Sequence, residues 1–590
     1  MKKTQEKDLL AQLPVNKETL SRAMDTLRRY KAGKASLDRR IIENEQWWKL
    51  RHWDYIKEQG TTELKTKSGW LVNVLLSKHA DAIDAFPEPN CLPREQNDTA
   101  QAQMLSAIIP VVLERNDFEK VWSDNWWKKL KAGAGIYGVY WDKSASDGLG
   151  DIAVCSVDPL NLFWEPGITD LQKSRNLFHV ELMDNELLQE QYPQLCGKLG
   201  GRAFTGARYL YDDNVDTAGM SAVIDWYYHK TVGGRRTLQY VKFVGDEVLY
   251  ATENDIVPGP DGRCMAQRGL YDHAEYPFVT DAMFPEEGTP IGFSYIDLCK
   301  DAQRQIDLMN NAIVANCIAA ATPRWLVRGD GGINEEEYAD WTKPFVHVQG
   351  TLDEAAIRQI TVQGMSANYL NLLSQKIGEL KETSGNRDVS NGGTAAGVTA
   401  ASAIAAIQEQ SGKLSRDQIQ NSYRCYRQIV LLIIELIRQF YAAPRQFRIT
   451  GAGGASEFVS FDSAGLQRTV QNGIYNCPLF DIEVSAQKQN AYSKLSNNEL
   501  ALQLFKLGMF NPQLAPQAAV CVQMMDFKGK EQVLQQIGEN ARLLQAASVP
   551  ASAAPAARLP QTDRLGAAIR MESSAMTAAR QAAAETTRPR

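Results

Sequence analysis

One short segment of the chain matches a pattern that can bind a nucleotide phosphate. Residues 133–138 read Gly-Ala-Gly-Ile-Tyr-Gly, which fits the spacing GxGxxG. In dinucleotide-binding folds this motif follows a strand and opens a helix, so that the pyrophosphate meets free helix amides. Here the order is reversed, because residues 126–132 read as helix and residues 136–141 as strand. We therefore interpret the glycines as a helix-to-strand turn.

Closely spaced carboxylates could in principle act as a general acid and base. Asp297 and Asp301 are one helical turn apart, and residues 286–287 are two adjacent glutamates. Such a pair would need converging side chains and a pocket. Lys300 and Arg304 alternate with the two aspartates, which favours a solvated, ion-paired helix face. The sequence also contains neither a Walker GxxxxGKS/T motif nor GxSxG, so we predict no catalytic residue and no enzyme activity.

The residue types that bind metals are scattered along the chain. The nine cysteines stand singly without CxxC spacing, and the six histidines form no HExxH motif. We expect the cysteines to be free thiols, as is usual in a reducing cytoplasm. No metal site and no cofactor is predicted.

Composition places the chain among ordinary soluble globular proteins. It has 590 residues, 44% hydrophobic and 23% charged, enough for two to four domains or one large elaborated domain. The formal net charge of −6 argues against a protein that grips nucleic acid by neutralising phosphates. No apolar run follows the first lysines, and residues 430–437 are too short an apolar stretch for a membrane helix. We expect a soluble protein made in the cytoplasm.

The elements that position these residues begin with helices and continue with strands. Residues 1–140 read as mostly helical. Residues 136–141 and 151–157 predict a hairpin, and residues 223–250 predict an antiparallel meander with glycine turns. Two tryptophan clusters could stack on bases, but core or subunit packing is favoured because aromatic rings bury large areas. The clusters are Trp47, Trp48 and Trp53, and Trp122, Trp126 and Trp127.

The second half begins with a helix of about 30 residues that starts after Pro290 and ends before Pro323. Residues 324–360 form a compact mixed segment, with strands predicted at 324–328 and 345–348. A second helix is predicted over residues 367–383.

A loop rich in Gly, Asn and Ser follows at residues 384–394, and then a very long helix at residues 396–441. About 45 helical residues would span nearly 70 Å, a length more typical of large assemblies than of small domains. Strand-like segments return at 446–450, 458–461 and 479–484, and helices at 491–545.

This order of elements resembles the portal proteins of tailed bacteriophages, which are rings through which DNA enters and leaves the capsid. Residues 292–295, Gly-Phe-Ser-Tyr, open a helix in a way that is similar to the start of that family's stem. Residues 394–410 resemble its junction between loop and long helix, and residues 150–167 resemble its wing strand and Asp-Pro turn. The resemblance covers residues 120–545, and the order of the motifs carries it more than any one of them.

The resemblance implies a helix-rich α+β portal fold with a wing, a two-helix stem, a small α/β clip, a channel loop, a very long wing helix and a helical crown. The implied domains are an N-terminal helical arm (1–45), the wing (46–289), stem helix 1 (290–321), the clip (322–360), stem helix 2 (361–383), the channel loop (384–395), the long wing helix (396–443), wing strands (444–490), the crown (491–545) and an Ala-rich tail (546–590) that is expected to be disordered.

The resemblance also implies the sites. The channel loop would line the narrowest part of the channel, with Arg387 contacting phosphate and Asp388 limiting adhesion; a plain connection between helices is the alternative. The expected loop residues are Asn386, Arg387, Asp388, Val389, Ser390, Asn391, Gly392 and Gly393. The clip would dock partners through exposed side chains, and the candidates are Trp325, Arg328, Glu335, Glu336 and Glu337.

The implied function is a dodecameric ring at one capsid vertex of the virion, assembled in the host cytoplasm, for DNA packaging and ejection. The implied partners are about eleven further copies of the chain, weakly bound double-stranded DNA, the terminase large subunit, head–tail adaptor or tail proteins, and major capsid and scaffolding proteins, with no membrane. Another head–tail connector or adaptor is the alternative. A more distant alternative is a nucleotide-dependent enzyme, because only the motif at residues 133–138 supports that function.

Overall fold

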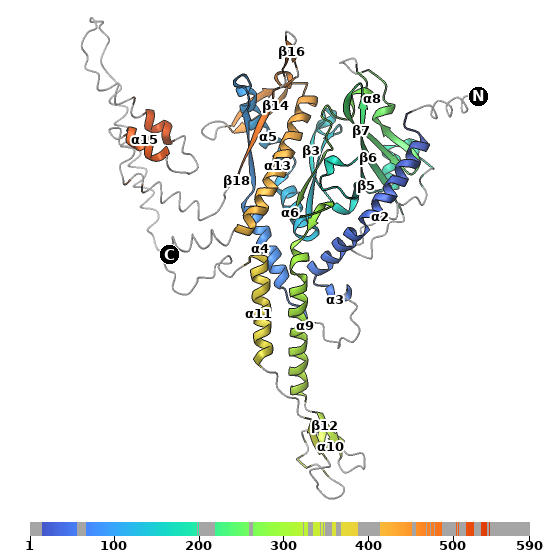
Figure 1. Ribbon diagram of the computed structural model, residues 1–590, viewed down its shortest axis with the longest axis vertical. Helices are drawn as coiled ribbons and strands as arrows, with labels where there is room; N and C mark the ends of the chain where they lie inside the picture. Colours follow the sequence, from blue (N-terminus) through green and yellow to red (C-terminus); the bar gives the residue numbers. More distant parts are fainter. Residues whose placement is uncertain are drawn as a thin grey trace, which may run out of the picture. The chain divides into compact units, whose positions relative to one another are not determined.

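The computed structural model describes residues 14–55, 66–197, 199, 219–258, 263–322, 367–386, 413–450 and 456–467, and shorter pieces within 324–360, 469–486 and 503–542. The chain divides into two compact units, Met1–Lys488 and Gln489–Arg590, which are described separately. Helices and strands alternate along the first unit, in agreement with the predicted α+β class (Figure 1).

Helices dominate the N-terminal part, as predicted. The first begins where the side chain of Asn16 accepts a hydrogen bond from the Thr19 amide, a standard N-cap. A short strand, β1, interrupts the helices and was not predicted, because its three prolines are unfavourable in a strand. The elements are α2 (Lys17–Trp48), α3 (His52–Tyr55), α4 (Trp70–Asp84), β1 (Pro87–Pro93), α5 (Thr99–Arg115) and α6 (Phe118–Ala132).

The predicted hairpin is confirmed as β2 and β3, which with β9 form a three-stranded antiparallel sheet in the order β3-β2-β9. The predicted meander is confirmed as β6, β7 and β8, part of a five-stranded sheet in the order β4-β5-β6-β7-β8. The strands are β2 (Ala134–Asp142), β3 (Asp151–Val157), β4 (Leu162–Phe163), β5 (Asn176–Asp184), β6 (Met220–Val232), β7 (Arg235–Val244), β8 (Glu247–Ala251) and β9 (Phe278–Ala282). The short helices α7 (Asn185–Gln191) and α8 (Met265–Arg268) lie in the connections.

The two long helices α9 (Tyr295–Ala321) and α11 (Ala367–Ser384) pack side by side (Figure 1). The predicted start of the first at residue 290 was wrong. A hairpin of β10 (Phe284–Glu286) and β11 (Thr289–Phe293) occupies that position, and the helix begins only after Ser294. The Ser294 side chain accepts from the Asp297 amide while Asp297 accepts from the Ser294 amide, a capping box that fixes this start.

Between α9 and α11 the chain forms a small module of β12 (Arg324–Val327), α10 (Glu335–Ala339) and β13 (Ile357–Ile360). A strand was predicted at 345–348; residues 346 and 348 lie outside the described residues, Phe345 and His347 are not in a strand, and β12 pairs antiparallel with β13. His347 is held elsewhere: its amide and its Nδ1 both contact Oε2 of Glu337, at 2.9 and 2.8 Å.

The helix α13 (Lys413–Phe440) supplies the centre of the main core through buried residues such as Tyr426, Ile429, Ile433 and Ile437. The earlier part of the predicted long helix, residues 396–412, lies outside the described residues. Of the strands that follow, the first two and the last agree with those predicted, and the last pairs with β1; the short hairpin between them was not predicted. They are β14 (Arg445–Thr450), β15 (Ser456–Phe461), β16 (Thr469–Gln471), β17 (Ile474–Asn476) and β18 (Phe480–Ala486).

In the second unit the described residues are helical. The helix α15 (Ala515–Gln523) contributes Ala518 and Val522 to a small apolar cluster with Ile537. The Ala-rich residues 546–590 lie outside the described residues.

Candidate stem and docking surfaces

The glycine motif forms a tight helix-to-strand turn, as predicted. Gly133 ends α6 with φ +94°, and a Cβ placed on it would lie 2.2 Å from the carbonyl oxygen of Gly292. A Cβ on Gly135 would lie 2.8 Å from the carbonyl oxygen of Asn125. These glycines therefore allow close backbone packing, and the following segment is a strand rather than the helix that a phosphate site requires.

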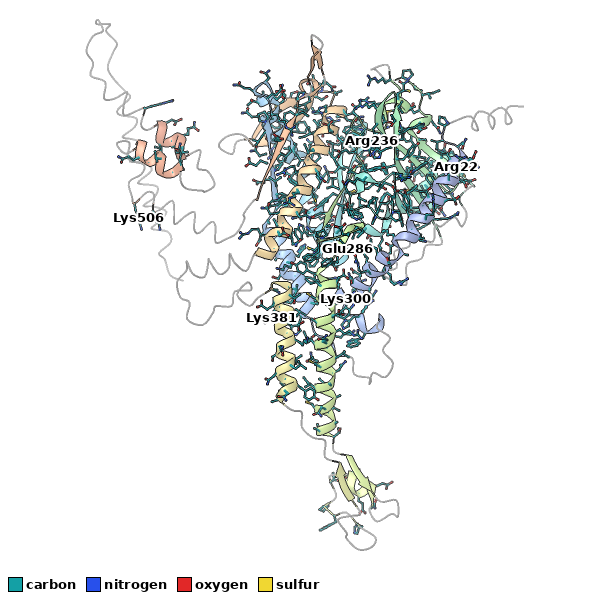
Figure 2. All side chains as sticks on the ribbon, in the orientation of Figure 1. Arg22, Arg236, Glu286, Lys300, Lys381 and Lys506 are labelled. Carbon is teal, nitrogen blue, oxygen red and sulfur yellow. The ribbon has the colours of Figure 1, made fainter. Side chains whose placement is uncertain are left out.

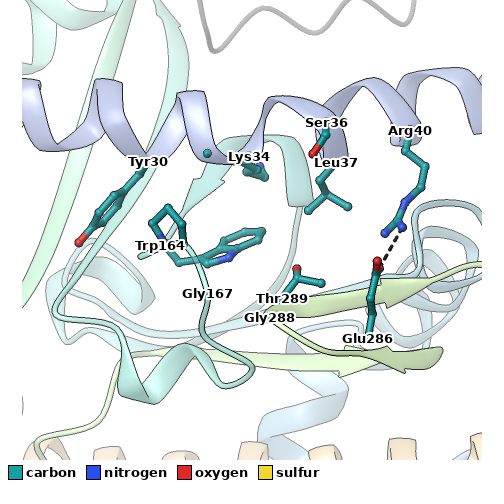
Figure 3. Close-up of a pocket in the computed structure, with 12 residues that line it drawn as sticks. Tyr30, Lys34, Ser36, Leu37, Arg40, Trp164, Gly167, Glu286, Gly288 and Thr289 are labelled. Atoms are coloured by element: carbon teal, nitrogen blue, oxygen red, sulfur yellow. Dashed lines mark hydrogen bonds and ion pairs between the residues drawn. The ribbon is translucent and has the colours of Figure 1, made fainter.

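The carboxylates singled out in the sequence support the start of α9. Besides capping the helix, Asp297 accepts from the Asn44 amide nitrogen at 3.1 Å and lies 3.5 Å from the Lys300 ammonium. This agrees with the predicted ion-paired helix face. Glu286 pairs with Arg40 at 2.9 Å (Figure 3). Neither arrangement leaves a carboxylate pair facing a pocket.

The tryptophan clusters are core packing, as favoured from the sequence. Trp47, Trp122 and Trp126 are each at most 3% exposed, and the Trp47 ring stacks on His52 with centroids 4.3 Å apart. Trp48 and Trp127 are partly buried and pack against the same core. They offer no open stacking surface for bases.

A groove of about 340 Å³ lies between α2, the turn at residues 164–167 and the β10–β11 hairpin (Figure 3). Its one buried charge is already engaged, because Lys34 donates to the carbonyl oxygens of Pro159 and Leu162 and pairs with Asp38 at 3.1 Å. Burial lowers the pKa of Lys34. The buried charge of the groove is therefore already satisfied by the protein itself.

The pair α9 and α11, which we call the stem, is anchored to the body by a buried polar network. Asp307 is fully buried, and its Oδ1 accepts from the amide and hydroxyl of Ser68 at 2.9 and 2.6 Å and from Gln303. Its Oδ2 lies 3.0 Å from Nε2 of His52. Figure 2 shows Lys300 and Lys381 at the end of the stem that adjoins the body. The network fixes the angle at which α9 leaves the body.

Beyond this anchor the α9 part of the stem carries no charge, and both helices expose apolar side chains. Residues 308–323 contain no Lys, Arg, Asp or Glu. No residue of α9 after Asp307 is buried, and in α11 only Leu380 and Ser384 are. Ile318 is 47% exposed and Leu370 55%. Sequence analysis did not single out this stretch, although its missing charges were visible there.

The predicted clip residues belong to the module between β12 and β13. Trp325 lies in β12 and Glu335 begins α10, while Arg328 lies outside the described residues. Glu336 is exposed, whereas Glu337 is engaged by His347. Phe345, which was not predicted, is the most exposed large apolar side chain described in the module, at 76%.

Of the eight residues expected to line the channel, only Asn386 is described. Asn386 is 4% exposed, and its amide donates to the Ser384 hydroxyl at 3.3 Å. The remaining residues, 387–393 with Arg387 and Asp388, lie outside the described residues, and their role stays a prediction.

Among the residues that the structure describes, no group of three or more His, Cys, Asp or Glu side chains could hold a metal ion. None of the helices within those same residues has the length and apolarity that a membrane crossing requires.

The family model described as "Phage P22-like portal protein" matches residues 284–588, from the β10–β11 hairpin through the stem, the small module, α13 and most of the C-terminal unit. No curated protein matches the chain.

Proposed function

Because this chain belongs to the family of P22-like portal proteins, we propose that about twelve copies close into a ring at one capsid vertex. The ring would be the conduit for DNA during packaging and ejection. It would also be the platform on which the terminase docks first and the tail afterwards. The chain would act as a structural component of the virion, with ATP hydrolysis supplied by the terminase.

The exposed stem, in which the part of α9 after Asp307 carries no charge, is the observation that carries this proposal. Apolar side chains such as Ile318, Tyr369 and Leu370 are about half exposed, and no charge lies between residues 308 and 323. A stable surface helix normally presents charged residues to water on one face. A continuous exposed apolar surface instead marks a site of contact with another protein. Neighbouring stems packed around a channel would cover it.

The missing charges also suit the passage of DNA. Each phosphate that a lysine or arginine neutralises adds affinity and would slow movement. Residues 308–323 offer no such contact. In the proposed channel, Arg387 would be the main phosphate contact and Asp388 would limit adhesion.

The small module between the stem helices would be the clip. Two exposed side chains of this module, the charged Glu336 and the apolar Phe345, would contact a docking protein. Trp325, Arg328 and Glu335 remain proposed contacts.

The ring can be tested by light scattering on a sizing column followed by negative-stain electron microscopy. We expect a species of about 0.8 MDa, about twelve times the 65.7 kDa subunit, with a central hole. Ile318→Asp should abolish it by placing a charge in the stem contact. The matched control is Leu149→Asp, because Leu149 is 54% exposed but lies in the turn between β2 and β3.

Two results would contradict the proposal. If Ile318→Asp forms rings as well as Leu149→Asp does, the stem is not the contact. If the unsubstituted chain forms only a compact dimer or tetramer, the proposal of a ring is wrong. A smaller ring with another copy number would instead favour a different head–tail connector.

A further inference from the structure

The four residues before α4, residues 66–69, belong to neither a helix nor a strand and lie against the stem helix α9. We call them the strap. The Thr66 amide donates to Oδ1 of Asn311 at 2.6 Å, and the Ser68 amide donates to Oδ1 of Asp307 at 2.9 Å. The buried Asp307 anchor is therefore one part of a longer contact between the strap and α9.

The spacing of the partners matches on the two sides of this contact. Asp307 and Asn311 are four residues apart in a helix, which is about 6 Å along its axis. Thr66 and Ser68 are two residues apart, which is about 6.6 Å in an extended chain. Both are half-buried, whereas Lys67 between them is exposed, as expected when alternate residues face the helix. The strap amides therefore meet successive side chains of one face of α9.

The same face of α9 supplies a third acceptor. The Leu71 amide, in the first turn of α4, donates to Oε1 of Gln303 at 3.0 Å. Gly69, which precedes α4, offers no side-chain cap, so Gln303 satisfies an amide at the open start of that helix. The positions one turn before and after this row of acceptors are Cys299 and Ala315, whose side chains contain no oxygen. The strap therefore has a single register on α9.

The strap is also held on its other side. The indole Nε1 of Trp53, which is 4% exposed, donates to the Thr66 carbonyl oxygen at 3.0 Å. Directly after the strap, the Trp70 ring lies beneath the Lys381 ammonium of α11, 5.4 Å from the ring centroid. The strap and the residues next to it thus connect α3 to both helices of the stem (Figure 1).

These contacts hold α9 to the body at two heights. The first turn is fixed where Asp297 accepts from the side-chain amide of Asn44, and the strap holds the helix again at Asn311. The two points are about 21 Å apart along the helix, and Ala321 ends the helix about 15 Å further on. A helix held at one point can pivot, whereas two points fix its direction. A displacement at the strap would be enlarged about 1.7-fold at the end of α9.

We propose that Asn311 is a positioning residue for the wall of the DNA channel. Through the strap it sets the direction of α9, and the direction of α9 sets the radius at which the lower stem lines the channel. The proposal rests on the ring of the proposed function, in which the stems surround the channel. Asp307 is fully buried, whereas Asn311 is only partly buried, so the strap contact can be removed at Asn311 while the buried network stays.

The test compares Asn311→Leu with Asn310→Leu. Leucine keeps the size of asparagine and removes the acceptor. The control is matched, because Asn310 is also partly buried and its side chain forms no hydrogen bond within the described part of the chain. Cryo-electron microscopy of the rings should show α9 of Asn311→Leu tilted by about 5–10°, which moves Ile318 by about 3–5 Å. Asn310→Leu should move it by about 1 Å or less.

Two further variants separate positioning from a general loss of stability. Asn311→Asp keeps an oxygen acceptor for the strap and should leave α9 in place. Thr66→Val keeps the amide and removes the hydroxyl that donates to Asn311 at 2.6 Å, so it should tilt α9 in the same direction by a smaller angle. Circular dichroism checks that each variant is folded. Thr66→Val also provides the measurement if Asn311→Leu closes no ring.

Hydrogen exchange in unassembled subunits measures the strap contact without the ring. The Thr66 amide loses its acceptor in Asn311→Leu, so residues 66–68 should exchange about tenfold faster than in Asn310→Leu. Equal exchange in the two variants would overturn the proposal, because the strap would not depend on Asn311.

The outcomes in the ring separate the two proposals. If exchange becomes faster but α9 stays in place in the rings, Asn311 holds the strap alone; the positioning role is then wrong and the ring stands. If the unsubstituted chain forms no ring, the proposed function is wrong and the positioning role is wrong with it.

Discussion

The ammonium of Lys129 lies 2.7 Å from Oδ1 of Asp281, with both side chains at most 2% exposed. Lys129 also donates to the Ser422 hydroxyl at 2.7 Å, and Ser422 donates to the other oxygen of Asp281. The three residues belong to α6, β9 and α13. One buried ion pair therefore joins the N-terminal helices, the three-stranded sheet and the central helix.

Removing one partner of this pair should be costly. Lys129→Met leaves Asp281 buried without its counter-charge, and we expect a loss of about 3–5 kcal/mol in the free energy of unfolding. Lys131→Met is the control on the same helix, because Lys131 is partly exposed and pairs with Glu45 at 2.9 Å; it should lose about 1 kcal/mol or less. Urea denaturation of the two variants checks the difference. Equal losses would contradict a dominant role for the buried pair.

The turn at Gly133 gives a second prediction. Both Gly133 and Gly148 have positive φ, at +94° and +88°, but a Cβ on Gly148 meets nothing within 4 Å. Gly148→Ala should therefore cost only the backbone strain, about 1–2 kcal/mol. Gly133→Ala should cost about 3 kcal/mol or more, because its Cβ would collide with the Gly292 carbonyl. Thermal unfolding measures both, and similar melting temperatures would show that the backbone at Gly292 yields.

The third prediction concerns pH. Desolvation would raise the pKa of Asp225, but the contacts with His179, Lys242 and Tyr240 outweigh it and hold the pKa below the usual 3.8. A carboxylate with a lowered pKa stabilises the fold above the unfolded value and loses that contribution as pH falls through the folded value. Asp225→Asn should thus be less stable than the unsubstituted chain by about 1–3 kcal/mol at pH 7. The gap should shrink below about pH 4. A gap that stays constant down to pH 2 would contradict the assignment.

The fourth prediction concerns the expected channel loop. Deleting residues 387–393 while keeping the buried Asn386 should leave the proposed rings intact, because the proposed contacts between stems do not involve this loop. DNA packaging or retention should fall, since the proposed phosphate contact Arg387 is lost. Electron microscopy checks the rings and a packaging assay checks the DNA. Normal packaging would mean that the loop is a plain connection between helices.

Local patterns predicted local structure well. The hairpin of β2 and β3 and the meander of β6 to β8 follow from alternating residues and turn glycines, because each strand pairs with its neighbour in the chain. The sequence did not predict pairings between strands that are far apart in the chain. The strand β1 is rich in proline and pairs with β18, which lies far away in the sequence. Neither the residues of β1 nor the segments next to it in the chain therefore predicted a strand.

The small module shows the same limit at closer range. Residues 345–348 are as apolar as a strand, yet β12 pairs with residues 357–360, and His347 contacts Glu337 instead. For the stem the sequence indicated the helices and their order. It did not reveal that Asp307 anchors α9, because Ser68 and His52 come from distant segments.

The pairing of β1 with β18 also constrains how the subunit is made. Pro87 pairs with Ala486 and Pro93 with Phe480, so β1 leaves the ribosome long before its partner exists. At about 5–20 residues per second, translation of the intervening chain takes roughly 20–80 s. For most of that interval the N-terminal helices lack α13, and until its end they lack β18. The body of the subunit can therefore be completed only after residue 486 has been synthesised.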